Sequence, residues 1–174
     1  GALILMASAF PSSNFVGIDI SKDAIAKAQR DTRRKQVDNL EFTILDAAFL
    51  HENVNLKEAF DYVTAFDAIH DQIRPLRVLQ GIYHILAPQG LFSMVDIAAE
   101  SKLSDNLDHP MGPFLYTVSL MHCLPVGLVD EGAGLGMMWG RQKAVEILKA
   151  AGFQKVQVLE MPDDPFNLHY FCQK

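Results

Sequence analysis

Hydrophobic positions along this chain fall into two patterns, short unbroken apolar runs and longer stretches with helical spacing. The short runs are rich in β-branched and aromatic residues and predict strands at 15–19, 40–45, 60–66, 91–97, 156–160 and 166–172. Apolar positions three or four apart predict helices over 2–10, 21–35, 74–86, 114–123 and 141–151. A loop or short helix is expected at 47–57, and a tight turn at Pro88–Gly90.

The order of these elements predicts an α/β fold. Strands that alternate with helices favour a mostly parallel, doubly wound sheet with helices on both faces. The last two strands are joined by a short loop without a helix, so they must run antiparallel. Between residues 100 and 138 the alternation is lost, and this segment carries three prolines and five glycines. The 174 residues are expected to form one domain with an insertion at about 100–138.

Composition and charge narrow the classes of partner. The net charge is −6, from 15 basic and 21 acidic residues, and no long basic run is present, which argues against nucleic acid. The apolar opening residues are too few for a membrane span or a secretory signal, so a cytoplasmic location is the default expectation. Cys123 and Cys172 lack metal-type spacing and form no disulfide framework. We expect two buried free thiols and no metal site.

Candidate chemistry begins where the first two predicted strands end. Asp19 closes the first strand, two positions before the helix-capping residue Ser21, and Asp46 closes the second. Ligands of open α/β sheets bind at the carboxyl edge of the strands. One carboxylate there can accept both hydroxyls of a ribose, and a second can meet an adenine amino group. The alternative is that both acids simply start helices, a position that Asp favours.

Several motifs in order resemble those of the class I S-adenosylmethionine-dependent methyltransferases, in particular the O-methyltransferases. They are Phe-Val-Gly-Ile-Asp-Ile-Ser-Lys-Asp at 15–23, Leu-Asp-Ala-Ala at 45–48, Phe-Asp-Tyr-Val at 60–63, Leu-Ala-Pro-Gln-Gly-Leu-Phe at 86–92 and Ala-Ala-Gly-Phe at 150–153. Each motif is weak alone, but their order and spacing are specific, and the resemblance covers the whole chain. It implies a Rossmann-like methyltransferase sheet, with the segment 100–138 as an insertion that covers the substrate.

The resemblance also implies roles for individual residues, with S-adenosylmethionine as the cofactor. Asp19 would bind the ribose hydroxyls, and Ile20 would pack on the adenine. The other cofactor contacts would be Asp46 at the adenine amino group, Ala47 beside it, Phe66 near the methionine part, and Gly1 as the last glycine of a glycine-rich turn.

His70 and Asp71 resemble the His-Asp pair of the O-methyltransferases, in which the histidine is the general base. A hydroxyl nucleophile must lose its proton as it attacks, and histidine titrates near neutral pH. The alternative is that His70 only caps a helix or lines the cofactor site. An apolar set could line a substrate pocket, although core packing is the commoner fate of such residues. It consists of Met111, Phe114, Met121, Met138 and Trp139.

One departure from the family pattern is large. The first strand and its Gly-x-Gly-x-Gly turn are absent, apart from Gly1. In the family this strand lies between the strands predicted here at 15–19 and 60–66, and its loss would leave unpaired edges. We therefore expect these residues to be the carboxyl part of a longer chain, with any homodimer formed through residues outside it.

The sequence favours methyl transfer to an oxygen or nitrogen of a small molecule, with no nucleic acid and no membrane as partner. Two alternatives stay open. An acid at a strand end also binds nicotinamide ribose, so the chain could be an NAD(P)-dependent reductase domain. Tyr170 and Lys174 have the spacing of a reductase pair, but they fall on a predicted strand, where such residues lie too far apart. The second alternative is a non-catalytic, methyltransferase-like remnant.

Overall fold

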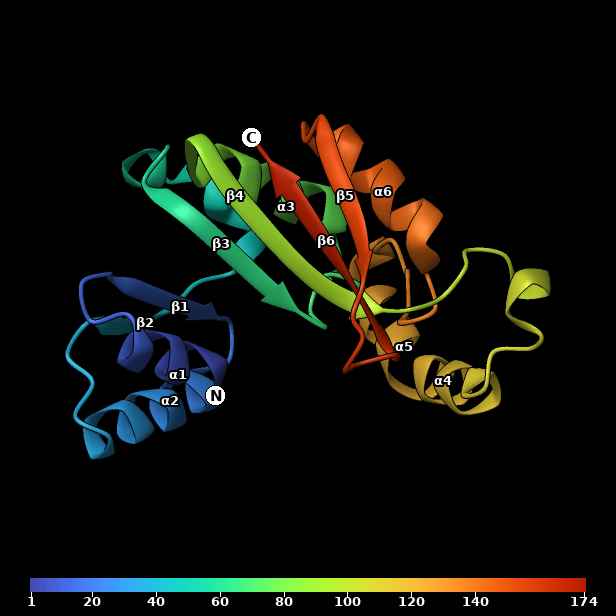
Figure 1. Ribbon diagram of the computed structural model, residues 1–174, viewed down its shortest axis with the longest axis horizontal. Helices are drawn as coiled ribbons and strands as arrows, with labels where there is room; N and C mark the ends of the chain where they lie inside the picture. The colour runs from blue at the N-terminus through green and yellow to red at the C-terminus, as the bar shows by residue number, and fades with distance from the viewer. The chain divides into compact units, whose positions relative to one another are not determined.

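The computed structural model describes residues 1–174, and the chain divides into two compact units, residues 1–47 and 48–174 (Figure 1). The first unit contains two helices and two strands, which are α1 (Ala2–Ala9), β1 (Phe15–Asp19), α2 (Lys22–Arg34) and β2 (Leu40–Ile44).

In the first unit, β1 and β2 pair in parallel, with Phe15 opposite Leu40 and Asp19 opposite Ile44. Both strands therefore end at the same edge. Helix α2 begins where the sequence predicts, because the Ser21 hydroxyl accepts a hydrogen bond from the backbone N–H of Ala24 at 3.2 Å.

The turn after α1 is fixed by a single amide side chain. Asn39 Nδ2 donates to the carbonyl oxygens of Ala7, Phe10 and Ser13 at 3.1, 3.1 and 2.8 Å. Ala7 lies in the last turn of α1, where carbonyl groups lack a helical partner, and Phe10 and Ser13 belong to the turn that follows. A small core of Ile4, Ala7 and Leu40 lies beneath the helix, so α1 is held by both polar and apolar contacts.

The second unit is built on a four-stranded sheet with the order β3-β4-β6-β5. Its strands are β3 (Phe60–Phe66), β4 (Leu86–Ile97), β5 (Lys155–Glu160) and β6 (Asn167–Gln173). Strand β3 runs parallel to β4, whereas β6 lies antiparallel between β4 and β5. The predicted α/β class with parallel pairing and an antiparallel last strand is confirmed, although hydrogen bonds divide the strands between two sheets.

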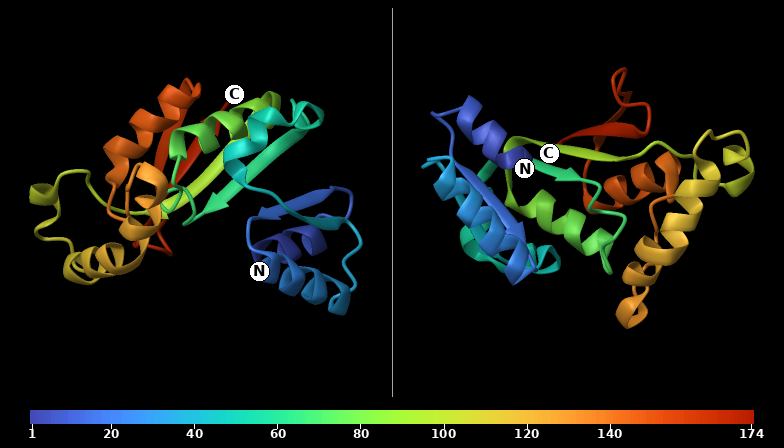
Figure 2. Two further views of the ribbon diagram at one scale, coloured as in Figure 1. Left: turned by 180° about the vertical axis from the view of Figure 1, so that it is seen from behind. Right: turned by 90° about the horizontal axis from the view of Figure 1, so that it is seen from below.

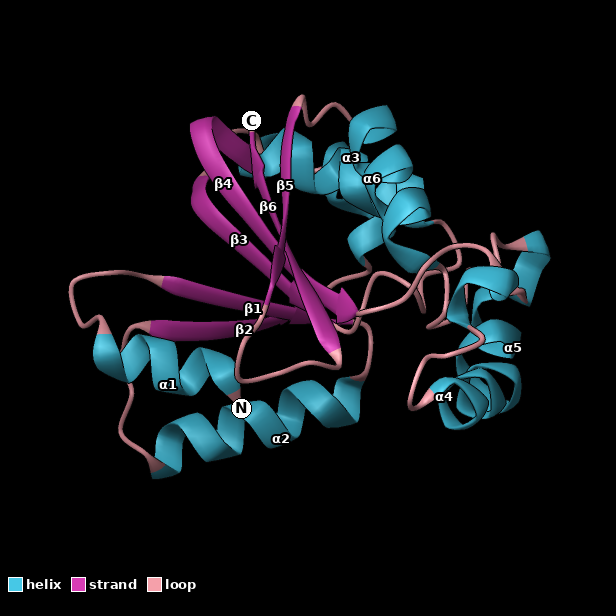
Figure 3. Ribbon diagram, turned by 45° about the vertical axis from the view of Figure 1, so that its right-hand side comes forward, coloured by secondary structure: helices cyan, strands magenta, loops and turns pink.

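The longer helices of this unit, α3 (Pro75–Ile85) and α6 (Gly140–Ala151), pack side by side on one face of the sheet (Figures 2 and 3). Phe92 of β4 stacks on Phe153 with ring centroids 5.6 Å apart. Gly152 ends α6 with a φ of 121°, a conformation that favours glycine. None of the helices is long and apolar enough to cross a membrane.

Two local predictions need correction. The tight turn expected at Pro88–Gly90 is a bulge inside β4, because Leu86 already pairs with Phe60 and the register shifts before Leu91 pairs with Tyr62. The single helix expected at 114–123 is α4 (Gly112–Val118), a π-helical turn (Ser119–Cys123) and α5 (Leu124–Gly127). Pro125 falls in the first turn of α5, where its missing N–H costs little.

The remaining elements are short 3₁₀ turns. They lie at Ala47–Glu52, Val54–Leu56, Leu103–Asn106 and Val129–Glu131.

Candidate functional site

A buried histidine and a buried carboxylate meet at the carboxyl ends of β3 and β4. His70 lies in the loop after β3 and is 2% exposed, and Asp96 lies near the end of β4 and is fully buried. The parallel pairing of β3 with β4 brings them together across 26 residues of sequence. The loop is tied to β4 because the N–H of Asp67 donates to the carbonyl of Val95 at 2.9 Å.

The Asp96 carboxylate fixes the orientation of the imidazole. Its Oδ1 lies 2.7 Å from Nδ1 of His70, and it also accepts hydrogen bonds from Trp139 Nε1 at 3.1 Å and from the backbone N–H of Ile97 at 2.9 Å. An ionised carboxylate only accepts, so Nδ1 of His70 must carry the proton that it donates. In the neutral imidazole the lone pair is therefore on Nε2.

Burial, the largest single influence, lowers the pKa of His70, but the hydrogen bond to Asp96 and the charges of Asp96, Asp71 and Asp67 outweigh it. The net result is a pKa above the ordinary value of 6.5. A raised pKa makes the neutral imidazole a stronger proton acceptor. This pair can hold a proton taken from a substrate, with the carboxylate stabilising the resulting imidazolium.

Two further side chains lie on the Nε2 side of the ring. Asp71 Oδ1 is 3.5 Å from Nε2 of His70 and is shielded from solvent. Cys123, the last residue of the π-helical turn, is 2% exposed. Burial, with a smaller contribution from Asp71, raises the pKa of the Cys123 thiol to about 11. Both cysteines are buried free thiols, as the sequence predicts.

In the first unit, Asp19 is the last residue of β1 and Asp46 lies two residues after the end of β2, and these parallel strands end at one edge. Both carboxylates are on exposed residues, and Ile20 beside Asp19 is 69% exposed. Asp19 Oδ1 also accepts the N–H of Ser21 at 2.7 Å, so this acid does support the start of α2. The helix-start role and a ligand role are compatible, because a carboxylate has about four acceptor positions.

The other predicted cofactor residues are divided between the units. Gly1 precedes α1 and is exposed, and Ala47 begins a 3₁₀ turn directly after Asp46. Phe66 ends β3 in the second unit and is 48% exposed.

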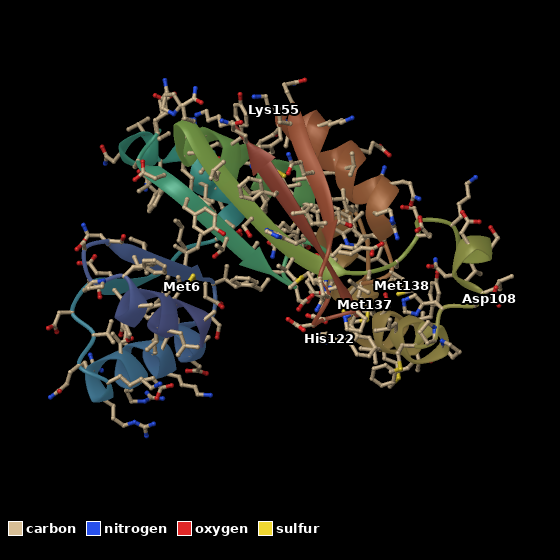
Figure 4. All side chains as sticks on the ribbon, viewed as in Figure 1. Met6, Asp108, His122, Met137, Met138 and Lys155 are labelled. Atoms are coloured by element: carbon tan, nitrogen blue, oxygen red, sulfur yellow. The ribbon has the colours of Figure 1, made fainter.

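The predicted substrate-pocket residues do not share one surface. Met138 and the partly buried Met111 pack in a core cluster with Leu115 of α4, and Figure 4 labels Met137 and Met138 in the segment before α6. Phe114 and Met121 are exposed on the helical segment that starts with α4. Trp139 is buried, and its indole N–H donates a hydrogen bond to Asp96.

A family model described as a methyltransferase domain matches residues 1–152. The chain belongs to this methyltransferase domain family. A search of curated proteins finds no match to its sequence.

Solved structures share the fold of this methyltransferase domain. A protein from Nostoc punctiforme, named as a candidate O-methyltransferase, is 19% identical with a TM-score of 0.73, and the match covers 98% of this chain and 48% of that one. The trans-methyltransferase CalH, crystallised with SAH, is 22% identical with a TM-score of 0.66, covering 92% and 42%. The [4+2]-cyclase SpnF is 14% identical with a TM-score of 0.64, covering 93% and 66%. The chain thus spans about half or less of the length of the Nostoc punctiforme protein and of CalH.

Three residues around His70 in this methyltransferase domain, Asp96, Asp71 and Cys123, were not predicted as functional residues in their own right. Asp96 lies one residue before the end of the strand predicted at 91–97, close to the position of Asp19 and Asp46 in theirs, and that position is the signal that could have identified it. Asp71 was visible only as the neighbour of His70. Cys123 carried no signal, since it lies 52 positions after Asp71 and within an irregular helical segment.

A broad hollow of about 840 Å³ lies elsewhere on the second unit, lined in part by Arg74, Arg77 and Lys143. None of the residues predicted to bind cofactor or substrate lines it. The chemistry of the buried histidine, and not the size of this hollow, identifies the candidate site.

Proposed function

We propose that residues 1–174 belong to a catalytic domain that transfers a methyl group from S-adenosylmethionine to an oxygen or nitrogen of a small molecule. The observation that carries the proposal is the buried His70–Asp96 pair at the carboxyl ends of β3 and β4. Membership of the methyltransferase domain family supplies the type of chemistry in which such a base is useful.

The acidic edge of the first unit suits the adenosine part of the cofactor. Asp19 and Asp46 present exposed carboxylates at the ends of neighbouring parallel strands, where they would accept hydroxyl and amino hydrogens. Ile20 offers an exposed apolar side chain to an aromatic base, and Gly1, Ala47 and Phe66 are assigned to the same ligand by their positions in the family pattern. When bound, S-adenosylmethionine supplies an electrophilic methyl group on a positively charged sulfur.

His70 is proposed as the general base. Asp96 keeps the proton on Nδ1, so Nε2 accepts the proton that a substrate hydroxyl or amine loses as its lone pair attacks. The imidazolium that forms is stabilised by the same carboxylate, which Trp139 and the backbone of Ile97 hold in place. A hydroxyl benefits most from this base, because it is the weaker nucleophile until its proton leaves.

The segment from 100 to 138 is proposed to cover the substrate and exclude water. It contains α4 and the π-helical turn, which carry the exposed apolar side chains of Phe114 and Met121. Met111 and Met138 would support this cover from its packed side. Net negative charge and this apolar surface favour a small organic substrate over nucleic acid.

The experiment is a methyl-transfer assay with radiolabelled S-adenosylmethionine and a panel of phenols, alcohols and amines. His70→Gln should lower turnover by about 10²- to 10⁴-fold on the best acceptor, the usual contribution of a general base. His122→Gln is the matched control, because His122 is exposed and one residue before Cys123 (Figure 4). Unchanged turnover of His70→Gln at every pH would show that His70 is not the base.

A second candidate function is suggested by the likeness to the [4+2]-cyclase SpnF, since one fold can serve unrelated chemistry. The domain would then bind the cofactor without consuming it, as a catalyst of another reaction or as a non-catalytic remnant. Conversion of S-adenosylmethionine to S-adenosylhomocysteine separates the two. The reductase alternative has no support from its expected pair, because Tyr170 is fully buried on β6 and Lys174 Nζ donates to the carbonyl of Leu86.

A further inference from the structure

Three side chains with metal-binding atoms converge beside the imidazole of His70. One ligand atom each from His70, Asp71 and Cys123 lies within 4.8 Å of the others. Two come from the loop after β3 and the third from the π-helical turn after α4, so the chain fold and not the sequence spacing assembles them. We infer that this cluster binds a zinc ion, a role beyond the proposed methyl transfer.

The chemistry of the three donors fits zinc. Imidazole nitrogen, carboxylate oxygen and thiolate sulfur are the ligands that Zn²⁺ takes from proteins, and a thiolate disfavours Mg²⁺ and Ca²⁺. Three protein ligands leave the fourth tetrahedral position for a water or a substrate atom. On binding, the S–H bond of Cys123 breaks, a sulfur–zinc bond forms from the sulfur lone pair, and the proton passes to solvent.

The surroundings of the cluster already have the arrangement of a second coordination shell. Nδ1 of His70 donates to Asp96, so Nε2 is the nitrogen left for a metal, and such a carboxylate–histidine pair fixes the ring of many zinc ligands. Asp96 is itself held by Trp139 and by the backbone of Ile97. Asp71 faces both other donors, because its shielded Oδ1 lies 3.5 Å from Nε2 of His70 and its carboxylate interacts with the Cys123 thiol.

Closure of the site requires only small movements. Ligand atoms of a tetrahedral zinc site lie roughly 3.3–3.8 Å apart, given metal–ligand distances of about 2.0–2.3 Å. The distances between the three ligand atoms, now up to 4.8 Å, therefore have to shorten by about 1 Å at most. Cys123 ends a π-helical turn, an irregularity that is frequent at functional sites.

Zinc and the proposed base compete for one lone pair. A zinc ion on Nε2 of His70 prevents that nitrogen from taking a proton, so bound zinc should inhibit a methyl transfer that depends on His70. A metal titration involves no turnover, so failure of the zinc site can be told apart from failure of the proposed methyl transfer.

The test is titration of the full chain with Co²⁺ alone, followed by displacement with Zn²⁺. A tetrahedral site with one thiolate should give intense visible d–d bands and a near-ultraviolet sulfur-to-cobalt band that saturate at one equivalent. One equivalent of Zn²⁺ should abolish both. Absence of the sulfur-to-cobalt band at saturation would overturn the inference.

Variants identify the ligands. Cys123→Ser should lose the sulfur-to-cobalt band, whereas Cys172→Ala and His122→Gln, the controls for the other thiol and for a surface histidine, should keep it. Asp96→Asn should weaken zinc binding about 10- to 100-fold, the usual effect of removing an outer-shell partner. If Cys123→Ser does not fold by circular dichroism, Asp71→Asn serves instead and should weaken Zn²⁺ at least tenfold. An unchanged spectrum in Cys123→Ser, or unchanged affinity in Asp71→Asn, would refute the site.

Discussion

The replacement of Asp96 by asparagine probes the buried pair most sharply. In the native protein Oδ1 of Asp96 receives all three donors, from His70, Trp139 and the backbone of Ile97. The second oxygen, Oδ2, is buried and has no hydrogen-bond partner. Asparagine can keep its oxygen at the Oδ1 position, and its NH₂ group then occupies the place of Oδ2.

The expected cost follows from these contacts. The hydrogen bond to His70 loses its charge assistance, which lowers stability by about 1–1.5 kcal/mol, the difference between bonds to charged and to neutral partners. The buried NH₂ group gains donors without acceptors, which costs about 1–3 kcal/mol. Together, Asp96→Asn should lower the free energy of unfolding by about 2–4.5 kcal/mol. The pKa of His70 should fall, because the charge of Asp96 and its charge-assisted hydrogen bond no longer oppose the effect of burial.

Urea unfolding of the metal-free protein, followed by tryptophan fluorescence, measures the stability change, since Trp139 lies in the pair's own environment. NMR titration of the histidine ring protons measures the pKa of His70. The matched control is Asp108→Asn, an exposed acid labelled in Figure 4, which should change stability by less than about 0.5 kcal/mol. If Asp96→Asn is as stable as this control and the pKa of His70 does not fall, the pair does not hold the imidazole as described.

Three further predictions concern other parts of the chain. Tyr170→Phe should leave the free energy of unfolding in urea unchanged or raise it by about 1 kcal/mol, because the buried hydroxyl has no hydrogen-bond partner. A clear loss of stability would show that the hydroxyl does have a partner. Asn39→Ala should destabilise α1 by about 2–3 kcal/mol, which hydrogen exchange would detect as faster exchange of the amides of residues 2–9. The control is Asn14→Ala at an exposed position, and equal exchange rates in the two variants would contradict the contact of Asn39 with three carbonyl groups. The raised pKa of His70 contributes stability that is fully present below pH 6.5 and is lost as the pH rises through the pKa of the folded state. In metal-free His70→Gln the free energy of unfolding should therefore change less with pH over this range.

Elements with a strong local signal could be predicted from the sequence. Phe15–Asp19 and Phe60–Phe66 are strands with the predicted bounds, and Ser21 caps α2, because apolar runs and capping residues act locally. The bulge in β4 could not be predicted, since Pro88 and Gly90 are equally typical of a tight turn. Its cause is the pairing of Leu86 with Phe60, which depends on the sheet.

Single residues of the candidate site could be predicted from the sequence, but their contacts with one another could not. His70 and the acids at strand ends stand out in the sequence, but the contact of His70 with Asp96 requires the parallel register of β3 and β4. The indole N–H of Trp139 reaches the same carboxylate from the start of α6, although its apolar ring suggested a pocket wall. Cys123 joins them through a π-helical turn, which no simple periodicity predicts.

The central claim, that this methyltransferase-family chain is built to use S-adenosylmethionine, is tested most directly by NMR titration of the full chain with S-adenosylhomocysteine. This method detects dissociation constants into the millimolar range. We predict saturable binding that Asp19→Asn weakens at least tenfold and that Asp23→Asn, an exposed acid in the first turn of α2, leaves unchanged. No binding at millimolar ligand, or equal affinity in the wild type and Asp19→Asn, would contradict the account.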